Sequence, residues 1–196
     1  MVLKFIQENN LSSTADLQIF FTNRMSNFID SFNHRMMGWN EILGVNIHEW
    51  NNSNELQPKQ ELAKSAIIHF WKGDINLMTD AVSGGYDVVN ALHSETYLDY
   101  SYESLPLSRA YAFEPVPERL DKAFHHKVLG LSCQMWSEWI PAIDDMERQV
   151  FPRLAAYAEV GWTQKDKKSY TRFQSSLNNL LKRWDNLKID YSINVE

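Results

Sequence analysis

The sequence predicts an α/β fold in which short parallel strands alternate with helices. Four short apolar runs are separated by segments whose apolar residues recur at helical spacing. Strands that alternate with helices favour parallel pairing through right-handed crossovers. The chain has 196 residues, whereas a whole (β/α)8 barrel needs roughly 250. We therefore expect a single domain over residues 1–196 that either has a different fold or forms part of such a barrel.

The first predicted elements are a helix and a strand. Residues 13–16 have the pattern of a capping box, with Ser13 as the N-cap. Apolar residues then recur at helical spacing through residues 17–32, which indicates an amphipathic helix. The first strand is predicted over His34–Trp39.

The next segment predicts a strand, a helix and a strand. The second strand covers Ala66–Trp71 and stops at Lys72-Gly73. A helix over Ile75–Ser83 ends at Gly84-Gly85, because glycine favours the conformation that ends a helix. The third strand is predicted over Tyr86–Ala91.

The last third of the chain predicts one strand and two helices. Residues 106–117 form a long connection with one helical turn, and the fourth strand covers Lys127–Trp136. Helices are expected over Asp144–Val160 and Lys165–Leu187. The fold class is therefore α/β, with about four parallel strands and flanking helices.

Composition excludes some classes of function. The net charge is −6 and the basic residues are scattered, which argues against nucleic acid as a partner. The single cysteine, Cys133, allows no internal disulfide and reads as a small buried apolar residue. No apolar run is long enough to span a membrane.

Aromatic residues follow the predicted strands. Trp39, Trp71 and Trp136 end three strands, and Tyr97 follows the other one. A tryptophan at the end of one strand is more often part of a core. Four aromatic residues at equivalent places are expected to converge, because the carboxyl ends of barrel strands form the functional face. The Trp136-Ser137-Glu138 segment offers a flat apolar ring beside a carboxylate, which suits a sugar.

These segments resemble the family 20 glycoside hydrolases, the β-N-acetylhexosaminidases. Phe151–Trp162 keeps the family pattern Phe-Pro-Arg-Leu-Ala-Ala-x-Ala-Glu-x-x-Trp, and Trp136-Ser137-Glu138 matches its last strand. Gly38–Glu41, Phe70–Gly73 and Tyr97–Asp99 resemble its Gly-Trp-Asp-Glu, Trp-Arg-Gly and Tyr-Leu-Asp motifs. The resemblance implies the C-terminal half of a TIM-type (β/α)8 barrel, a partial catalytic domain ending in two helices.

The resemblance also implies roles for six residues. The walls of the pocket for the substrate's N-acetyl methyl group would be Trp39, Trp71 and Trp136. Tyr97 would hydrogen-bond the acetamido group, and Asp99 and Glu138 would bind the outer sugar hydroxyls. The implied reaction is removal of terminal non-reducing N-acetylhexosamine residues by substrate-assisted retaining catalysis. No cofactor and no metal are implied.

The family's catalytic pair, an adjacent Asp-Glu, is missing from this chain. No Asp-Glu dipeptide occurs in the sequence, and Asp121 and Asp144-Asp145 have the contexts of helix starts. The family's sugar-binding arginine is absent too, and Asn40 replaces the usual aspartate of its motif. We therefore expect the catalytic pair upstream of this chain and no useful hydrolysis by the isolated chain.

Two other interpretations remain open at this point. The chain could be a non-catalytic module that binds N-acetylated sugars, or a scaffold whose three indoles pack apart from one another. Expected partners are glycans that contain N-acetylglucosamine or N-acetylgalactosamine, and a second copy or the missing half-barrel. His125-His126 reads as a solvated loop pair, and Arg153 and Glu159 as structural residues without a mutual pair. Members of the family are typically secreted, periplasmic or lysosomal.

Overall fold

A computed structural model describes residues 2–44 and 62–193. The chain divides into two compact units. Unit 1 comprises Met1–Val89 and Asp121–Leu129, and unit 2 comprises Asn90–Leu120 and Gly130–Glu196.

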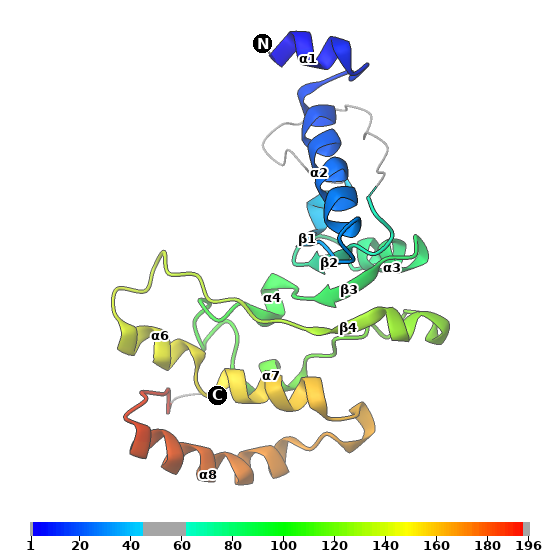
Figure 1. Cartoon of the computed structure of the whole chain (residues 1–196). Helices are drawn as coiled ribbons and strands as arrows, with labels where there is room; N and C mark the ends of the chain where they lie inside the picture. The colour runs from blue at the N-terminus through cyan, green and yellow to red at the C-terminus, as the bar shows by residue number, and fades with distance from the viewer. Residues whose placement is uncertain (1, 45–61, 194–196) are drawn as a thin grey trace. The chain divides into compact units, whose positions relative to one another are not determined.

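Four short strands form one sheet, which confirms the predicted α/β fold class. They are β1 (Met37–Trp39), β2 (Ile67–Phe70), β3 (Asp87–Asn90) and β4 (Val128–Leu131), in the order β1-β2-β3-β4. β1 and β2 lie side by side and parallel, with Trp39 opposite His69 (Figure 1).

Unit 1 holds the helices that precede and join its strands: α1 (Val2–Glu8), α2 (Thr14–Asp30), η1 (Asn40–Leu43), α3 (Asn76–Ser83) and η2 (Lys122–Lys127). The predicted cap of α2 is confirmed, because the Ser13 hydroxyl accepts a hydrogen bond from the backbone N–H of Asp16. The Asp16 carboxylate accepts from the N–H of Ser12 at 2.6 Å, one residue before the usual partner in a capping box.

A charged cluster ties three segments of unit 1 together. The Asp87 carboxylate, at the start of β3, contacts Arg35 at 2.5 Å and Lys127 at 3.1 Å. Burial raises the pKa of Asp87, but the hydrogen bonds and charges of Lys127 and Arg35 outweigh it, so the net shift is downward. The strands and α3 of unit 1 also bury apolar side chains: Ile68, Phe70, Met78, Val82 and Val88.

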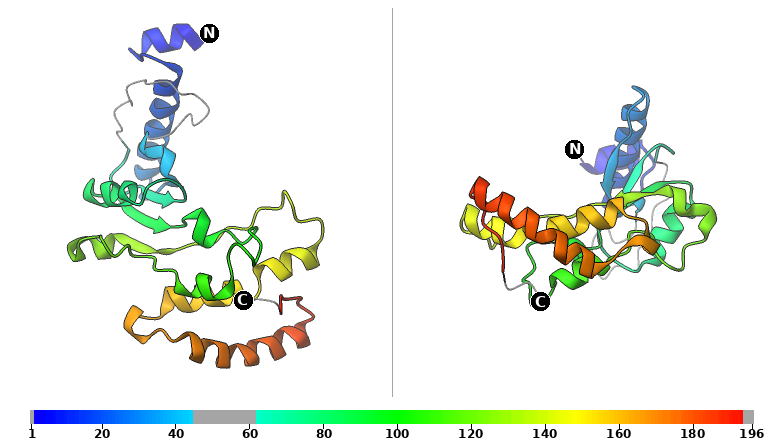
Figure 2. Two further views of the ribbon diagram at one scale, coloured as in Figure 1. Left: turned by 180° about the vertical axis from the view of Figure 1, so that it is seen from behind. Right: turned by 90° about the horizontal axis from the view of Figure 1, so that it is seen from below.

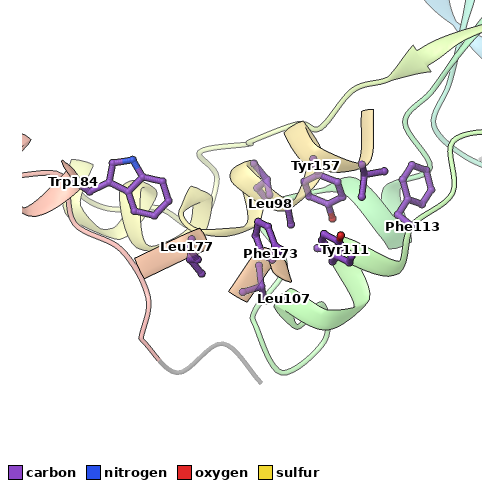
Figure 3. Close-up of a cluster of buried hydrophobic side chains, with 11 residues drawn as sticks. Leu98, Leu107, Tyr111, Phe113, Tyr157, Phe173, Leu177 and Trp184 are labelled. Carbon is purple, nitrogen blue, oxygen red and sulfur yellow. The ribbon is translucent and has the colours of Figure 1, made fainter. Parts of the chain in front are cut away.

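Unit 2 is mostly helical. Its elements are α4 (His93–Thr96), α5 (Leu107–Ala112), α6 (Ile143–Val150), α7 (Arg153–Trp162), η3 (Lys165–Lys167) and α8 (Tyr170–Leu187). α7 and α8 lie side by side (Figure 2) and contribute to one buried apolar cluster. Figure 3 shows that Leu98 from the connecting segment joins Tyr157 of α7 and Phe173 of α8 in this cluster.

All four predicted strands are longer than the observed ones, and the fourth and first differ most. The fourth strand stops at Leu131 rather than Trp136, because its neighbour β3 gives way to α4. The chain beyond β4 keeps only irregular pairing, with a single bridge between Tyr97 and Gln134. The first strand is also shorter than predicted and begins at Met37.

The predicted helix over Asp144–Val160 is two helices. α6 ends at Val150 and α7 begins at Arg153, with Pro152 between them. Proline has no N–H to donate and clashes with the preceding turn, so it ends a helix. The predicted helix over Lys165–Leu187 likewise starts later, at Tyr170, where the Ser169 hydroxyl caps it.

None of the helices in the described part of the chain combines the length and the apolar character needed to cross a lipid bilayer.

Candidate functional site

Trp39 and Trp71 of unit 1 contact each other. β1 ends at Trp39, and Trp71 directly follows β2. Their ring centroids lie 5.8 Å apart, with an angle of 69° between the planes, in an edge-to-face arrangement. The parallel register puts both at the carboxyl end of adjacent strands. The structure thus brings together two of the three indoles that the sequence predicts to line a pocket.

Glu41 fixes the orientation of Trp71. The Trp71 indole Nε1 donates to the two Glu41 carboxylate oxygens, at 2.8 and 3.0 Å. The side-chain oxygen of buried Asn40 accepts from the backbone N–H of Trp71 at 3.1 Å. Both acceptors come from the turn after β1, so the turn that follows one tryptophan holds the other.

His69 is a residue of this site that the sequence prediction missed. Its imidazole stacks on the Trp39 indole, with centroids 4.3 Å apart and an interplanar angle of 13°. Burial lowers the pKa of His69, so the ring is neutral near pH 7. A signal existed, because residues two apart on a strand share a face, and His69 lies two residues before Trp71.

Tyr97 and Trp136 form the aromatic pair of unit 2. Their ring centroids are 6.2 Å apart, with the planes tilted by 48°. The backbone aligns them, because the N–H of Leu98 donates to the carbonyl of Gln134 at 2.7 Å. Tyr97 is buried, whereas Trp136 is 44% exposed and presents its ring to solvent.

Two further aromatic residues surround Tyr97 and were not predicted. The His93 Nδ1 and Tyr100 hydroxyl atoms are 2.6 Å apart, and both rings contact Tyr97. His93 belongs to α4, an element that the sequence analysis did not predict. The contact joins residues seven positions apart across an irregular turn, and no periodic pattern signals such a pair.

Asp99 of unit 2 is half-buried. Burial raises its pKa above the usual value, and the negative charge of Glu138 acts in the same direction. The backbone N–H of Asp99 and the charge of Arg153 lower it, without reversing the net shift. The Asp99 Oδ1 atom is buried without a hydrogen-bond partner among the described residues. A ligand hydroxyl would supply the missing donor.

The structure places the predicted residues in two groups. Trp39 and Trp71 belong to unit 1, and Tyr97 and Trp136 belong to unit 2. Unit 2 also holds the predicted carboxylates, half-buried Asp99 and exposed Glu138.

A metal site and the Cys133 thiol are two weaker candidates. In residues 2–44 and 62–193, no group of three or more His, Cys, Asp or Glu side chains is arranged to hold a metal ion. Burial raises the pKa of the Cys133 thiol, which packs against the apolar cluster of unit 2. A thiol in such surroundings is a poor nucleophile.

Comparison with known proteins identifies the family. The model for "Glycosyl hydrolase family 20, catalytic domain" matches residues 1–165. A beta-hexosaminidase of Porphyromonas gingivalis is 29% identical over 203 aligned positions, which cover 97% of this chain and 24% of that protein. A beta-N-acetylhexosaminidase of Cellulomonas fimi is 25% identical, with 77% of this chain and 30% of that protein covered.

Solved structures of the same kind share the fold. The exo beta-N-acetylglucosaminidase of Vibrio harveyi, in complex with N-acetylglucosamine, matches with a TM-score of 0.76 and 25% identity over 97% of this chain and 29% of that one. The beta-N-acetylhexosaminidase of Bacteroides fragilis matches with a TM-score of 0.74 and 18% identity, covering 96% of this chain and 38% of that one. The chain spans about a quarter of the length of curated relatives such as the beta-hexosaminidases of Porphyromonas gingivalis and Vibrio furnissii. Since the family model covers most of the 196 residues, the chain belongs to glycosyl hydrolase family 20, a family of glycoside hydrolases.

Proposed function

We propose that this chain supplies the acetamido-binding residues of a β-N-acetylhexosaminidase that removes terminal non-reducing N-acetylhexosamine residues. In this proposal the substrate's own acetamido oxygen attacks the anomeric carbon, which is the substrate-assisted retaining route of the family. The catalytic Asp-Glu pair lies outside these 196 residues, because the sequence has no such dipeptide.

The observation that carries the proposal is the pairing of aromatic rings at the positions of the family motifs. Trp39 contacts Trp71, and Tyr97 contacts Trp136. Burying one methyl group stabilises a complex by only about 0.8 kcal/mol, so such rings act mainly by orientation. Holding an intramolecular nucleophile in attack geometry can lower a barrier by roughly 7–11 kcal/mol. Rings on the acetamido group would exclude the rotamers that point its oxygen away from the anomeric carbon.

Asp99 and Glu138 supply the polar part of the proposed site. The buried Oδ1 atom of Asp99 has an unmet acceptor capacity, and Glu138 is exposed. Carboxylates accept hydrogen bonds from sugar hydroxyls when they are ionised. The substrate class proposed is glycans that end in N-acetylglucosamine or N-acetylgalactosamine. The N-acetylglucosamine bound to the Vibrio harveyi enzyme supports this choice of sugar.

A sugar titration tests the proposal directly. The chain should bind N-acetylglucosamine more tightly than glucose, because only the former carries the acetamido group. Tyr97→Phe should weaken N-acetylglucosamine binding by about tenfold, the effect of one lost hydrogen bond of about 1.4 kcal/mol, and leave glucose unaffected.

The matched control is Tyr191→Phe, because the Tyr191 hydroxyl donates to Asp185 of α8 and has no role in the proposed site. Equal affinity for the two sugars, or equal loss in both variants, would count against the proposal.

A separate prediction follows from the absence of an Asp-Glu dipeptide in this sequence. General acid catalysis typically contributes 10²–10⁴-fold and has no candidate residue here. Purified chain should therefore release no measurable product from a chromogenic N-acetylglucosaminide. Robust turnover that co-purifies with the chain would show that the acid lies within it, and the pair would have to be assigned anew.

A further inference from the structure

We propose that Arg153 is a positioning residue for the sugar site: its guanidinium fixes the Tyr97–Tyr100 segment that carries Tyr97 and Asp99. The inference rests on the proposed function, since it concerns how two of the proposed ligand contacts are held. Arg153 itself is placed too deep to touch a ligand, because its relative exposure is 0%.

One guanidinium binds two carbonyls of this segment. The Arg153 Nη2 atom donates to the carbonyl of Leu98 at 2.6 Å, and Nη1 donates to the carbonyl of Tyr100 at 2.7 Å. These carbonyls flank Asp99 on both sides. A third bond from Nη1, to Leu105 at 3.3 Å, holds the end of the loop that follows.

The remaining donors of Arg153 are also engaged, which fixes the guanidinium itself. Its Nε atom donates to the carbonyl of Gln149 at 3.0 Å, and Nη2 donates to the Gln149 side-chain oxygen at 2.7 Å. The guanidinium lies over the Tyr102 ring, 4.1 Å from its centroid. The Tyr102 hydroxyl in turn donates to the Phe151 carbonyl at 2.9 Å.

Arginine is suited to this arrangement and lysine is not. A guanidinium presents five N–H groups in a rigid plane, whereas an ammonium group presents three from a flexible stem. An apolar residue of similar size would fill the space but leave the carbonyls of Leu98 and Tyr100 without donors. Unpaired buried carbonyls are costly, so the segment would shift to find other donors.

The charge of Arg153 also acts on Asp99. Burial and Glu138 raise the pKa of Asp99, and the Arg153 charge opposes them. Burial lowers the pKa of Arg153 itself. Removing the guanidinium should therefore move the Asp99 pKa further upward, so that the carboxylate would lose its charge at a higher pH. Loss of sugar affinity on acidification would then begin at a higher pH as well.

The test compares Arg153→Lys and Arg153→Met with Arg172→Met, an exposed arginine of α8 whose side chain bonds Lys167 and pairs with Glu159. Three quantities are measured: the Asp99 carboxyl titration by carbon NMR, hydrogen exchange of the Leu98 amide, and affinity for N-acetylglucosamine.

We expect both Arg153 variants to lose at least about tenfold in affinity. Their Leu98 amide should exchange faster, and Arg153→Met should raise the Asp99 pKa. Arg172→Met should match wild type in all three. Unchanged affinity and an unchanged Asp99 titration in Arg153→Met would overturn the inference.

A milder variant keeps the test decisive if the Arg153 variants do not fold. Gln149→Met removes the side-chain amide, whose oxygen accepts from Nη2, and keeps the backbone carbonyl, so it should shift the Leu98 exchange and the sugar affinity in the same direction. No shift in either would overturn the inference. Wild-type chain that binds no N-acetylglucosamine would refute the proposed function alone, because the Asp99 titration and Leu98 exchange need no sugar.

Discussion

Asn40 departs from the aspartate of the family motif, and its surroundings make the amide necessary in this chain. Its side-chain nitrogen donates to the carbonyl of Lys72 at 3.1 Å, while its oxygen accepts from the N–H of Trp71. The side chain is 3% exposed. An aspartate would keep the acceptor but turn a second oxygen toward the Lys72 carbonyl.

Asn40→Asp should therefore lower the free energy of unfolding by about 1–3 kcal/mol at neutral pH, the cost of an unpaired buried polar group. A carboxylate facing a carbonyl has a raised pKa in the folded state. The deficit should thus be largest above that pKa and shrink as the pH falls through it. Urea unfolding at pH 7 and pH 5 measures both effects.

Asn178→Asp, on the exposed face of α8, is the matched control and should change stability little. A neutral effect of Asn40→Asp at pH 7 would contradict the hydrogen-bond assignment.

Individual residues of the site were predictable where a motif or a period marks them. Trp39 and Trp71 stand at strand ends, which the alternation of strands and helices predicts. Glu41 and Asn40 belong to a family motif that the sequence shows. Their hydrogen bonds to Trp71, which follows β2, could be found only from the folded backbone. His93 was not predicted as a site residue, because an irregular turn without a periodic pattern brings it to Tyr100.

At the scale of elements, the wrong end of the predicted fourth strand arises because the structure of one segment depends on another. β4 ends early because α4 interrupts the neighbouring strand, and the sequence of β4 itself carries no sign of this. The division between α6 and α7 could have been predicted, since Pro152 marks it. Apolar residues keep helical spacing on both sides of Pro152. The spacing alone therefore predicts one continuous helix over Asp144–Val160.

The turn between β2 and α3 offers a test at this scale. Gly73 has φ of +103°, and a Cβ there would lie 2.8 Å from the Leu77 Cδ1 atom. Gly73→Ala should destabilise the chain by about 1–2 kcal/mol through backbone strain and this contact. Because the turn follows Trp71, the Trp71 indole resonance should shift as well.

Gly161→Ala is the opposing control. A Cβ at Gly161, in α7, meets only the Leu131 Cδ2 atom at 3.8 Å, an ordinary contact. Alanine is the better helix former, so this variant should gain about 0.5–1 kcal/mol. Thermal unfolding of both variants measures these changes in stability. A Gly73→Ala variant that is more stable than wild type would show that the turn is not strained.

At the scale of the whole molecule, the sheet and the apolar surface bear on assembly. In the strand order β1-β2-β3-β4 the outer strands are β1 and β4. Among the described residues, large apolar side chains are exposed on α2, just after it and on these strands: Phe21, Phe28, Phe32, Met37 and Leu129. Open strand edges and exposed apolar surface favour association.

Purified chain should therefore form a dimer or a larger assembly, since a two-fold pair buries the same surface twice. Light scattering coupled to size exclusion measures the mass directly. Phe28→Lys, on the exposed face of α2, should shift the distribution toward monomer, whereas Trp162→Lys on α7 tests the effect of an added charge elsewhere. A stable wild-type monomer over a wide concentration range would contradict the prediction.

In the proposed function, the N-acetyl group of the sugar contacts four aromatic residues: Trp39, Trp71, Tyr97 and Trp136. Indole nitrogen NMR of the seven tryptophans, assigned by single Trp→Phe variants and titrated with N-acetylglucosamine, tests it most directly. We expect the Trp39, Trp71 and Trp136 signals to shift along one binding curve, while the signals of exposed Trp162 and core Trp184 stay fixed. Shifts confined to one aromatic pair, or shifts reproduced by glucose, would contradict it.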